Sequence, residues 1–169
     1  MEILILVILI LLNGFFSLSE IALVSSKRSR LEQLKREGRN GAVTALRLLD
    51  NSGNFLSAIQ VGITLIGIVT GYYGGSNLAD DVTPLLEKTG LFKSSATEVA
   101  LVITILVITY FSIVIGELVP KTIALRNPEK IAARIAPFIS FFSKFFYAFV
   151  RFLSASTSLI IKILGIKIK

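Results

Sequence analysis

Two acidic side chains fall inside long apolar runs of this sequence, where a charge is costly. Glu20 lies near the end of the run over residues 3–26, and Glu117 near the end of the run over residues 99–119. A charged side chain within a membrane span costs about 2.5 to 3.5 kcal/mol on insertion scales, so each carboxylate is a candidate functional group. Because the sequence contains no cysteine and no histidine, the metal chemistry open to them is that of hard cations held by oxygen atoms.

Polar groups accompany the first carboxylate. Asn13 and Ser17 precede Glu20 at spacings that place all three side chains along one face of a helix. In the run 55–75, Gln60 and Thr64 lie one turn apart. They either complete a cation site or make interhelical hydrogen bonds, which is the commoner role of such residues in membranes. Asn13, Gln60 and Thr64 are therefore additional candidate ligands.

A free backbone carbonyl is expected beside the second carboxylate. Ser112 and Gly116 precede Glu117, and Pro120 follows it. Proline has no N–H group and pushes aside the carbonyl four residues earlier, so the Gly116 carbonyl should be free to bind a ligand. Two carboxylates, several hydroxyls, an amide and a free carbonyl form a ligand set suited to Mg²⁺, Ca²⁺ or Na⁺.

A structural interpretation competes with this one. Both acidic residues lie near the ends of their apolar runs, where they could simply pair with basic residues that follow them. The candidate partners are Lys27, Arg28 and Lys121. In that case Glu20 and Glu117 would tolerate neutral substitution.

The composition indicates which elements must position these residues. Of the 169 residues, 53% are hydrophobic and 17% charged, and the mean hydropathy is +0.77. Soluble domains contain about 45 to 50% apolar and about 25% charged residues, so a membrane protein is expected. Three runs are long enough to cross a bilayer, and spans are predicted at about 3–26, 54–75 and 98–119. A cleaved signal peptide is disfavoured for the first run, because the basic residues follow it and do not precede it.

The distribution of lysine and arginine predicts the orientation. Segment 27–51 contains seven basic and three acidic residues, whereas segment 76–97, the predicted second loop, contains two basic and three acidic residues. Cytoplasmic loops carry an excess of Lys and Arg, so the first segment is expected in the cytoplasm, the N-terminus outside and the C-terminus inside. The net charge of +7 is thus a topology signal, and no nucleic-acid partner is expected.

The remaining segments are predicted to be amphipathic helices on the cytoplasmic side. Residues 27–51 have the pattern of a short basic helix–turn–helix interrupted at residues 38–41. The predicted fold is an all-α integral membrane protein in one domain, residues 1–169. It has three transmembrane helices and a belt of juxtamembrane helices at about residues 128–165.

The C-terminal part of that belt has two candidate arrangements. Asn127 should cap a helix that Pro128 opens, and Pro137 should break or kink that helix. From residue 136 to residue 164, polar residues follow one face of a helix. A helix lying in the membrane interface is favoured over a fourth span, because two cations in its middle would otherwise face lipid.

Three blocks of sequence carry a family resemblance. They are Asn13-Gly14-Phe15-Phe16-Ser17 with Glu20-Ile21-Ala22-Leu23, Ile59-Gln60-Val61-Gly62-Ile63-Thr64-Leu65, and Gly116-Glu117-Leu118-Val119-Pro120-Lys121-Thr122-Ile123-Ala124 with Asn127-Pro128-Glu129. In this order they resemble the transmembrane domain of the CNNM/CorC family of magnesium transport proteins, the hemolysin-like membrane proteins of HlyC/CorC type. The resemblance implies a homodimer of three-helix protomers and a cation site near Ser17, Gly116 and Glu117 in an inward-facing acidic cavity. It also implies cytoplasmic CBS-pair and C-terminal domains, absent from this chain, that regulate transport through nucleotide binding.

One departure from the family pattern bears on the substrate. Many relatives have asparagine where this sequence has Ile63, and that asparagine is expected to bind the cation; many have a second asparagine where Gly67 stands. Either Gln60 or Thr64 substitutes, or water fills the position, or this branch transports something else. The variant resembles a subgroup to which both magnesium efflux and polyamine export have been ascribed.

The favoured function is export of Mg²⁺ across the cytoplasmic membrane, with Na⁺ as a candidate coupling ion. Glu117 would supply the charge, Gly116 a carbonyl, Ser17 and Ser112 hydroxyls, and Glu20 a second carboxylate. The alternatives are export of a polyamine such as putrescine or cadaverine, and a non-transporting membrane anchor and dimeriser for a CBS module. An enzyme is not expected, since the sequence has no histidine, no cysteine and no organised nucleophile.

Overall fold

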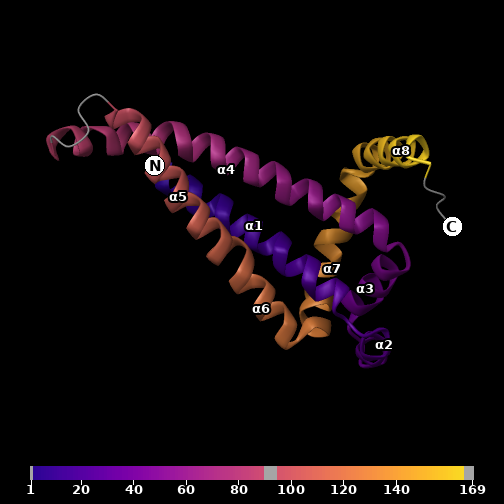
Figure 1. The fold of residues 1–169 in the computed structure, drawn as a ribbon. Helices are drawn as coiled ribbons and strands as arrows, with labels where there is room; N and C mark the ends of the chain where they lie inside the picture. Colours follow the sequence, from indigo (N-terminus) through magenta and orange to yellow (C-terminus); the bar gives the residue numbers. More distant parts are fainter. Residues whose placement is uncertain (1, 90–94, 166–169) are drawn as a thin grey trace.

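The computed structural model describes residues 2–89 and 95–165, and every secondary-structure element within these ranges is helical (Figure 1). In chain order the elements are α1 (Glu2–Val24), α2 (Arg28–Arg36), α3 (Asn40–Asp50), α4 (Ser52–Thr89), α5 (Ala96–Ile113), the π-helical turn η1 (Val114–Leu118), α6 (Val119–Arg126), α7 (Pro128–Phe145) and α8 (Tyr147–Ile163). The predicted all-α fold is confirmed.

Three helical segments are long and apolar enough to cross a membrane: α1, α4 and the continuous run α5–η1–α6. In Figure 1, α1 lies between α4 and the α5–α6 segment, and it contacts both. The three spans predicted from the sequence are therefore present as candidate spans. The predicted loop over residues 76–97 is wrong for residues 76–89, because α4 continues to Thr89. Leu78, Val82 and Leu85 recur at helical spacing there, so the apolar periodicity of a helix continues beyond the uninterrupted apolar run from which the span was predicted.

Aromatic rings join the C-terminal half of α1 to α7. Phe15 meets Phe138 with ring centroids 5.1 Å apart, and Phe16 meets Phe142 at 4.7 Å. A Cβ added to Gly62 of α4 would lie 3.2 to 3.3 Å from the rings of Phe142 and Phe16. Glycine at this position therefore lets α4 close on the same cluster, which ties α1, α4 and α7 together.

The predicted basic helix–turn–helix is confirmed in α2 and α3, with Gly38 at a positive φ of 82° between them. The Arg28 guanidinium of α2 donates to Asp50 of α3 at 2.6 Å and lies 3.6 Å from Glu32. The hydrogen bond to Asp50 and the charge of that carboxylate raise the pKa of Arg28 above its usual value. The contact with Asp50 joins α2 to α3, which also pack against one another.

The C-terminal helices differ from the sequence prediction. Asn127 takes the N-cap position of α7 and Pro128 its first turn, as predicted, although the Asn127 side chain makes no capping hydrogen bond. Pro137 does not break the helix; instead, α7 and α8 meet at Phe146 with a bend of 69°. A single straight helix over residues 136–164 is therefore wrong. The bent pair is also long and apolar enough to form a fourth, broken span.

The packing of α3 explains why α7 tolerates its internal proline. Pro137 has no N–H to offer the carbonyl of Ala133, four residues earlier. That carbonyl lies against Gly41 of α3, so closely that a Cβ at this position would overlap the oxygen. Since only glycine fits there, a neighbouring backbone covers the carbonyl that the proline leaves without a helical donor.

Candidate functional site

The first part of the candidate site is the crossing of α1 with the π-helical turn η1. In an α-helix the N–H of residue 120 would donate to the Gly116 carbonyl, but Pro120 has no N–H. Just before Pro120 the helix widens into a π-helical turn. The N–H of Val119 donates to the carbonyl of Val114, five residues back. The Nδ2 of Asn13 then donates to the Gly116 carbonyl at 3.2 Å. The carbonyl that was predicted to be free therefore accepts a hydrogen bond from a side chain of another helix. The sequence analysis did not anticipate this pairing.

Two glycines make this crossing unusually close. A Cβ at Gly14 would lie 3.0 Å from the Pro120 ring and 3.1 Å from the Ile115 carbonyl oxygen. A Cβ at Gly116 would lie 3.2 Å from both the carbonyl oxygen of Ile10 and the side chain of Asn13. The crossing thus brings polar backbone atoms into contact in the interior of the protein, an arrangement that small residues permit in membrane helices.

Unsatisfied and buried oxygen atoms line the crossing on α1. Within the part of the chain that the structure describes, the buried Oδ1 of Asn13 has no hydrogen-bond partner. Ser17, one turn along the same face of α1, is 1% exposed. A buried acceptor without a partner is rare in proteins and often indicates where water or an ion binds.

The carboxylate beside the crossing is already paired. Lys121 donates to Glu117 at 2.6 Å, one turn along the same helix, and the two side chains are 31% and 46% exposed. The ion pair with Lys121 that the structural interpretation expected is thus present for Glu117. Ser112 lies one turn before Gly116 and is half-buried, and no hydrogen bond joins it to another candidate ligand among the described residues.

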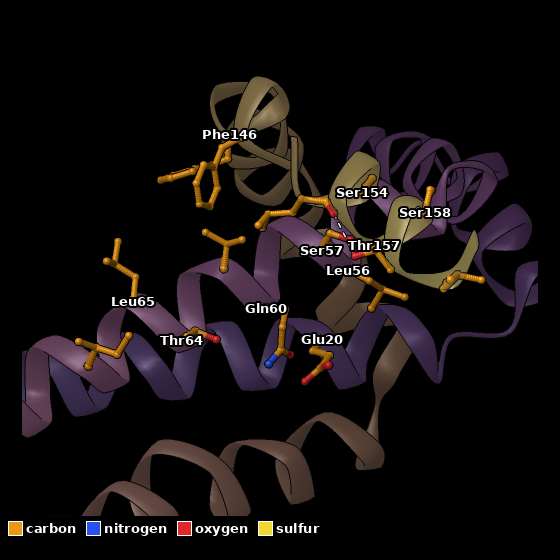
Figure 2. A pocket seen from close by; sticks show the side chains of 15 residues that line it. Glu20, Leu56, Ser57, Gln60, Thr64, Leu65, Phe146, Ser154, Thr157 and Ser158 are labelled. Carbon is orange, nitrogen blue, oxygen red and sulfur yellow. Dashed lines mark hydrogen bonds between the residues drawn. The ribbon is translucent and has the colours of Figure 1, made fainter. Parts of the chain in front are cut away.

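Glu20 occupies different surroundings. It makes no ion pair with any described lysine or arginine; Arg28, one of its candidate partners, pairs with Asp50 and Glu32 instead. Glu20 lines an open groove of about 1090 Å³ that also contains Gln60 and Thr64 of α4. Figure 2 shows the side chains of Glu20 and Gln60 next to one another and pointing the same way.

Helix α8 forms the other wall of this groove, a contribution that the sequence analysis missed. It supplies the ring of Phe149 and the hydroxyls of Ser154, Thr157 and Ser158. Phe146 lines the groove at the bend between α7 and α8 (Figure 2). The polar stripe along this segment was visible in the sequence. That stripe does not reveal which helix it faces, because this depends on the 69° bend.

The candidate ligands therefore form two groups. Asn13, Gly116 and the neighbouring Glu117 lie at the crossing, whereas Glu20, Gln60 and Thr64 line the groove. In the described ranges, no three acidic, histidine or cysteine side chains come together as a metal cluster. A cation at the crossing would therefore be held mainly by neutral oxygen atoms and one carboxylate, while a cation in the groove would meet one carboxylate among largely apolar residues.

The three apolar helices, joined to amphipathic helices outside the spans, define an α-helical membrane protein with several spans. Residues 4–169 match the family model described as the cyclin M transmembrane N-terminal domain, CNNM. The chain belongs to this family.

Relatives across the whole chain agree with this membership. The UPF0053 protein sll0260 of Synechocystis is 42% identical over 169 residues, which are all of this chain and 38% of that protein. The UPF0053 protein YhdT of Bacillus subtilis is 36% identical over 95% of this chain and 35% of that protein. A protein of Haemophilus influenzae named polyamine export protein is 29% identical over 82% of this chain and 32% of its own length. The chain thus spans less than two fifths of the length of the first two relatives.

Proposed function

We propose that this chain is the membrane domain of a cation transporter, with Mg²⁺ as the first candidate substrate and export across the cytoplasmic membrane as the direction. The observation that carries the proposal is the crossing of α1 and η1, where Asn13 meets the carbonyl whose α-helical donor Pro120 removes. The buried Oδ1 of Asn13 has no hydrogen-bond partner among the described residues, and Glu117 follows Gly116 directly in the chain. Oxygen atoms of this kind are the ligands of hard cations.

Lys121 serves in this proposal as a resident counter-ion. Its ammonium group neutralises Glu117 when no ion is bound, and an arriving Mg²⁺ displaces it. The divalent ion gains the carboxylate of Glu117, the carbonyl of Gly116 and the hydroxyls of Ser17 and Ser112. Glu20 would supply a second negative charge along the route, and inward Na⁺ is the candidate driving ion.

The deciding experiment is Mg²⁺ efflux from loaded cells that carry Glu117→Gln. We expect efflux to be abolished while expression and thermal stability are retained, since the paired and partly exposed carboxylate adds little to stability. Glu98→Gln is the matched control, because Glu98 is an exposed acid in the first turn of α5. Unchanged efflux in Glu117→Gln would reject the proposal and favour a non-transporting anchor and dimeriser for a CBS module, which proteoliposome flux would test directly.

A polyamine is the second candidate substrate, and a separate observation favours it. Among the described residues Glu20 has no ion-pair partner, and it lines a groove formed mostly by apolar side chains and hydroxyls. Such a groove suits a diamine better than a bare divalent ion. A relative carries the name polyamine export protein. Thermal-shift titration separates the two substrates: diamines such as putrescine or cadaverine should stabilise the protein in the second case, and Mg²⁺ or Na⁺ in the first. Glu20→Gln should remove only the diamine effect.

The proposed setting is the cytoplasmic membrane, with the N-terminus outside, the C-terminus in the cytoplasm and two copies forming a homodimer. The excess of basic residues in segment 27–51 supports this orientation. The greater length of the relatives supports additional domains, for which a cytoplasmic CBS pair is the candidate. Nucleotide would act through those domains alone.

A further inference from the structure

A second polar pocket lies away from both parts of the candidate site, between the two helices of the α2–α3 hairpin. Its volume is about 410 Å³. Its basic lining residues are Arg28, Lys35, Arg36 and Arg47. Its acidic lining residues are Glu32 and Asp50, and Val43 and Leu46 complete the lining with apolar side chains.

The charges of this pocket do not cancel. Both acidic residues are engaged by Arg28, which donates to Asp50 at 2.6 Å and lies 3.6 Å from Glu32. Lys35, Arg36 and Arg47 have no carboxylate within ion-pair distance among the residues that the structure describes. The hairpin thus holds two helices together with one arginine and leaves three cations facing a shared hollow.

The pocket lies beside the membrane. Only residues 25–27 separate the end of α1 from Arg28, and Arg47 lies little more than one turn before Ser52, where α4 begins. Both neighbouring helices are candidate spans. The hollow therefore lies close to the ends of two candidate spans, where lipid headgroups are expected.

We propose that the α2–α3 pocket binds the phosphate-bearing headgroup of an anionic membrane lipid. Arginine pairs of this kind match the geometry of phosphate oxygens, and basic clusters next to membrane spans recognise anionic lipids. Val43 gives the pocket a partly exposed apolar side chain, backed by the largely buried Leu46, that can contact the glycerol and upper acyl carbons of a lipid. A free phosphate has no such carbons. Binding there would join α2 and α3 to the bilayer next to the first two spans.

The test compares lipid binding by the purified chain in detergent, using native mass spectrometry with phosphatidylglycerol and phosphatidylcholine. We expect preferential retention of phosphatidylglycerol. Arg36→Gln and Arg47→Gln should each weaken its binding about fivefold, the effect of one basic residue near an anionic surface. Arg39→Gln is the matched control: it removes the same charge from the same hairpin, but Arg39 does not line the pocket. We expect its affinity to stay within about twofold of the parent chain.

Three results would overturn the proposal. The first is equal retention of the two lipids by the parent chain. The second is an equal loss in Arg39→Gln, which would mean diffuse attraction to surface charge. The third is complete displacement of the lipid by millimolar inorganic phosphate or glycerol phosphate, which would assign the pocket to a soluble phosphate. Circular dichroism melting of each variant must match the parent chain, so that a loss of lipid reflects the pocket and not unfolding. If Arg36→Gln or Arg47→Gln melts early, Lys35→Gln replaces it, with the same loss of about fivefold expected because Lys35 also lines the pocket.

Discussion

Pro120 and Pro137 each release a backbone carbonyl that lies against another helix, and the surroundings of these two carbonyls differ. Pro120 leaves the Gly116 carbonyl in a π-helical turn, where the amide of Asn13 donates to it at 3.2 Å. Pro137 leaves the Ala133 carbonyl in an unbroken helix, where the backbone of Gly41 covers it. The same local change therefore accompanies a side-chain hydrogen bond at one helix crossing and a close backbone–backbone contact at the other.

The difference shows that a proline inside a helix determines only that a carbonyl is released. The residue on the facing helix decides whether that oxygen remains open to a ligand. At Gly116 the facing residue is Asn13, whose side-chain oxygen has no partner in the part of the chain that the structure describes, whereas at Ala133 the facing residue is a glycine. Four substitutions test this contrast through thermal unfolding, followed by circular dichroism because the sequence has no tryptophan and no cysteine.

The largest effect is expected from Gly41→Ala. The added Cβ would overlap the Ala133 carbonyl oxygen, which is backbone and moves only if α3 and α7 separate. We expect a loss of about 3 kcal/mol or more of unfolding free energy. Gly67→Ala is the control, since nothing lies within 4 Å of a Cβ at that position, and it should be neutral or slightly stabilising. Equal melting temperatures for the two variants would contradict the close α3–α7 packing.

Gly14→Ala tests the other close approach. Here the new Cβ would lie 3.0 Å from the Pro120 ring and 3.1 Å from the Ile115 carbonyl, so a small shift relieves the contact. The expected loss is about 1 to 2 kcal/mol, smaller than for Gly41→Ala. Because the crossing widens, Mg²⁺-induced stabilisation should fall as well. A larger loss than that of Gly41→Ala would reverse the ranking of the two regions.

Asn13→Leu removes the α1 side-chain amide that donates a hydrogen bond to the Gly116 carbonyl. An interhelical hydrogen bond of this kind contributes about 1 kcal/mol in membrane proteins, so a loss of that size is expected. Thr122→Val provides the comparison, because Thr122 donates to the Leu118 carbonyl of its own helix at 2.8 Å on an exposed surface. If both variants melt alike, the Asn13 contact does not hold the crossing together.

Lys121→Met should change stability least. The pair with Glu117 is partly exposed and contributes about 0.5 kcal/mol or less. The carboxylate then loses its resident counter-ion, so the rise in melting temperature on adding Mg²⁺ should increase. Lys130→Met, which removes an exposed cation of α7, should leave that rise unchanged. A smaller Mg²⁺ response in Lys121→Met would mean that the lysine does not compete with the ion.

Much of the architecture could be predicted because it depends on local chemistry. Three apolar runs became three candidate spans, and the basic segment with its glycine break became α2 and α3. The bend at Phe146 could not be predicted, because Pro137 is the stronger sequence signal for a helix break in this segment. The helix continues through Pro137 because Gly41 of α3 packs against the carbonyl that this proline releases. The length of α4 was underestimated because the apolar run ends before the helix does.

The sequence by itself determined where the chain is apolar enough to enter a membrane, which acids lie inside those segments, and which carbonyl Pro120 releases. Each of these follows from the residue type or from spacing within one helix. Only the tertiary structure decided that Asn13 meets Gly116 across 103 positions, and that Glu20 lies with α8 along an open groove. Such contacts depend on which helix faces meet, and that choice depends on the close packing of glycines and aromatic rings throughout the fold.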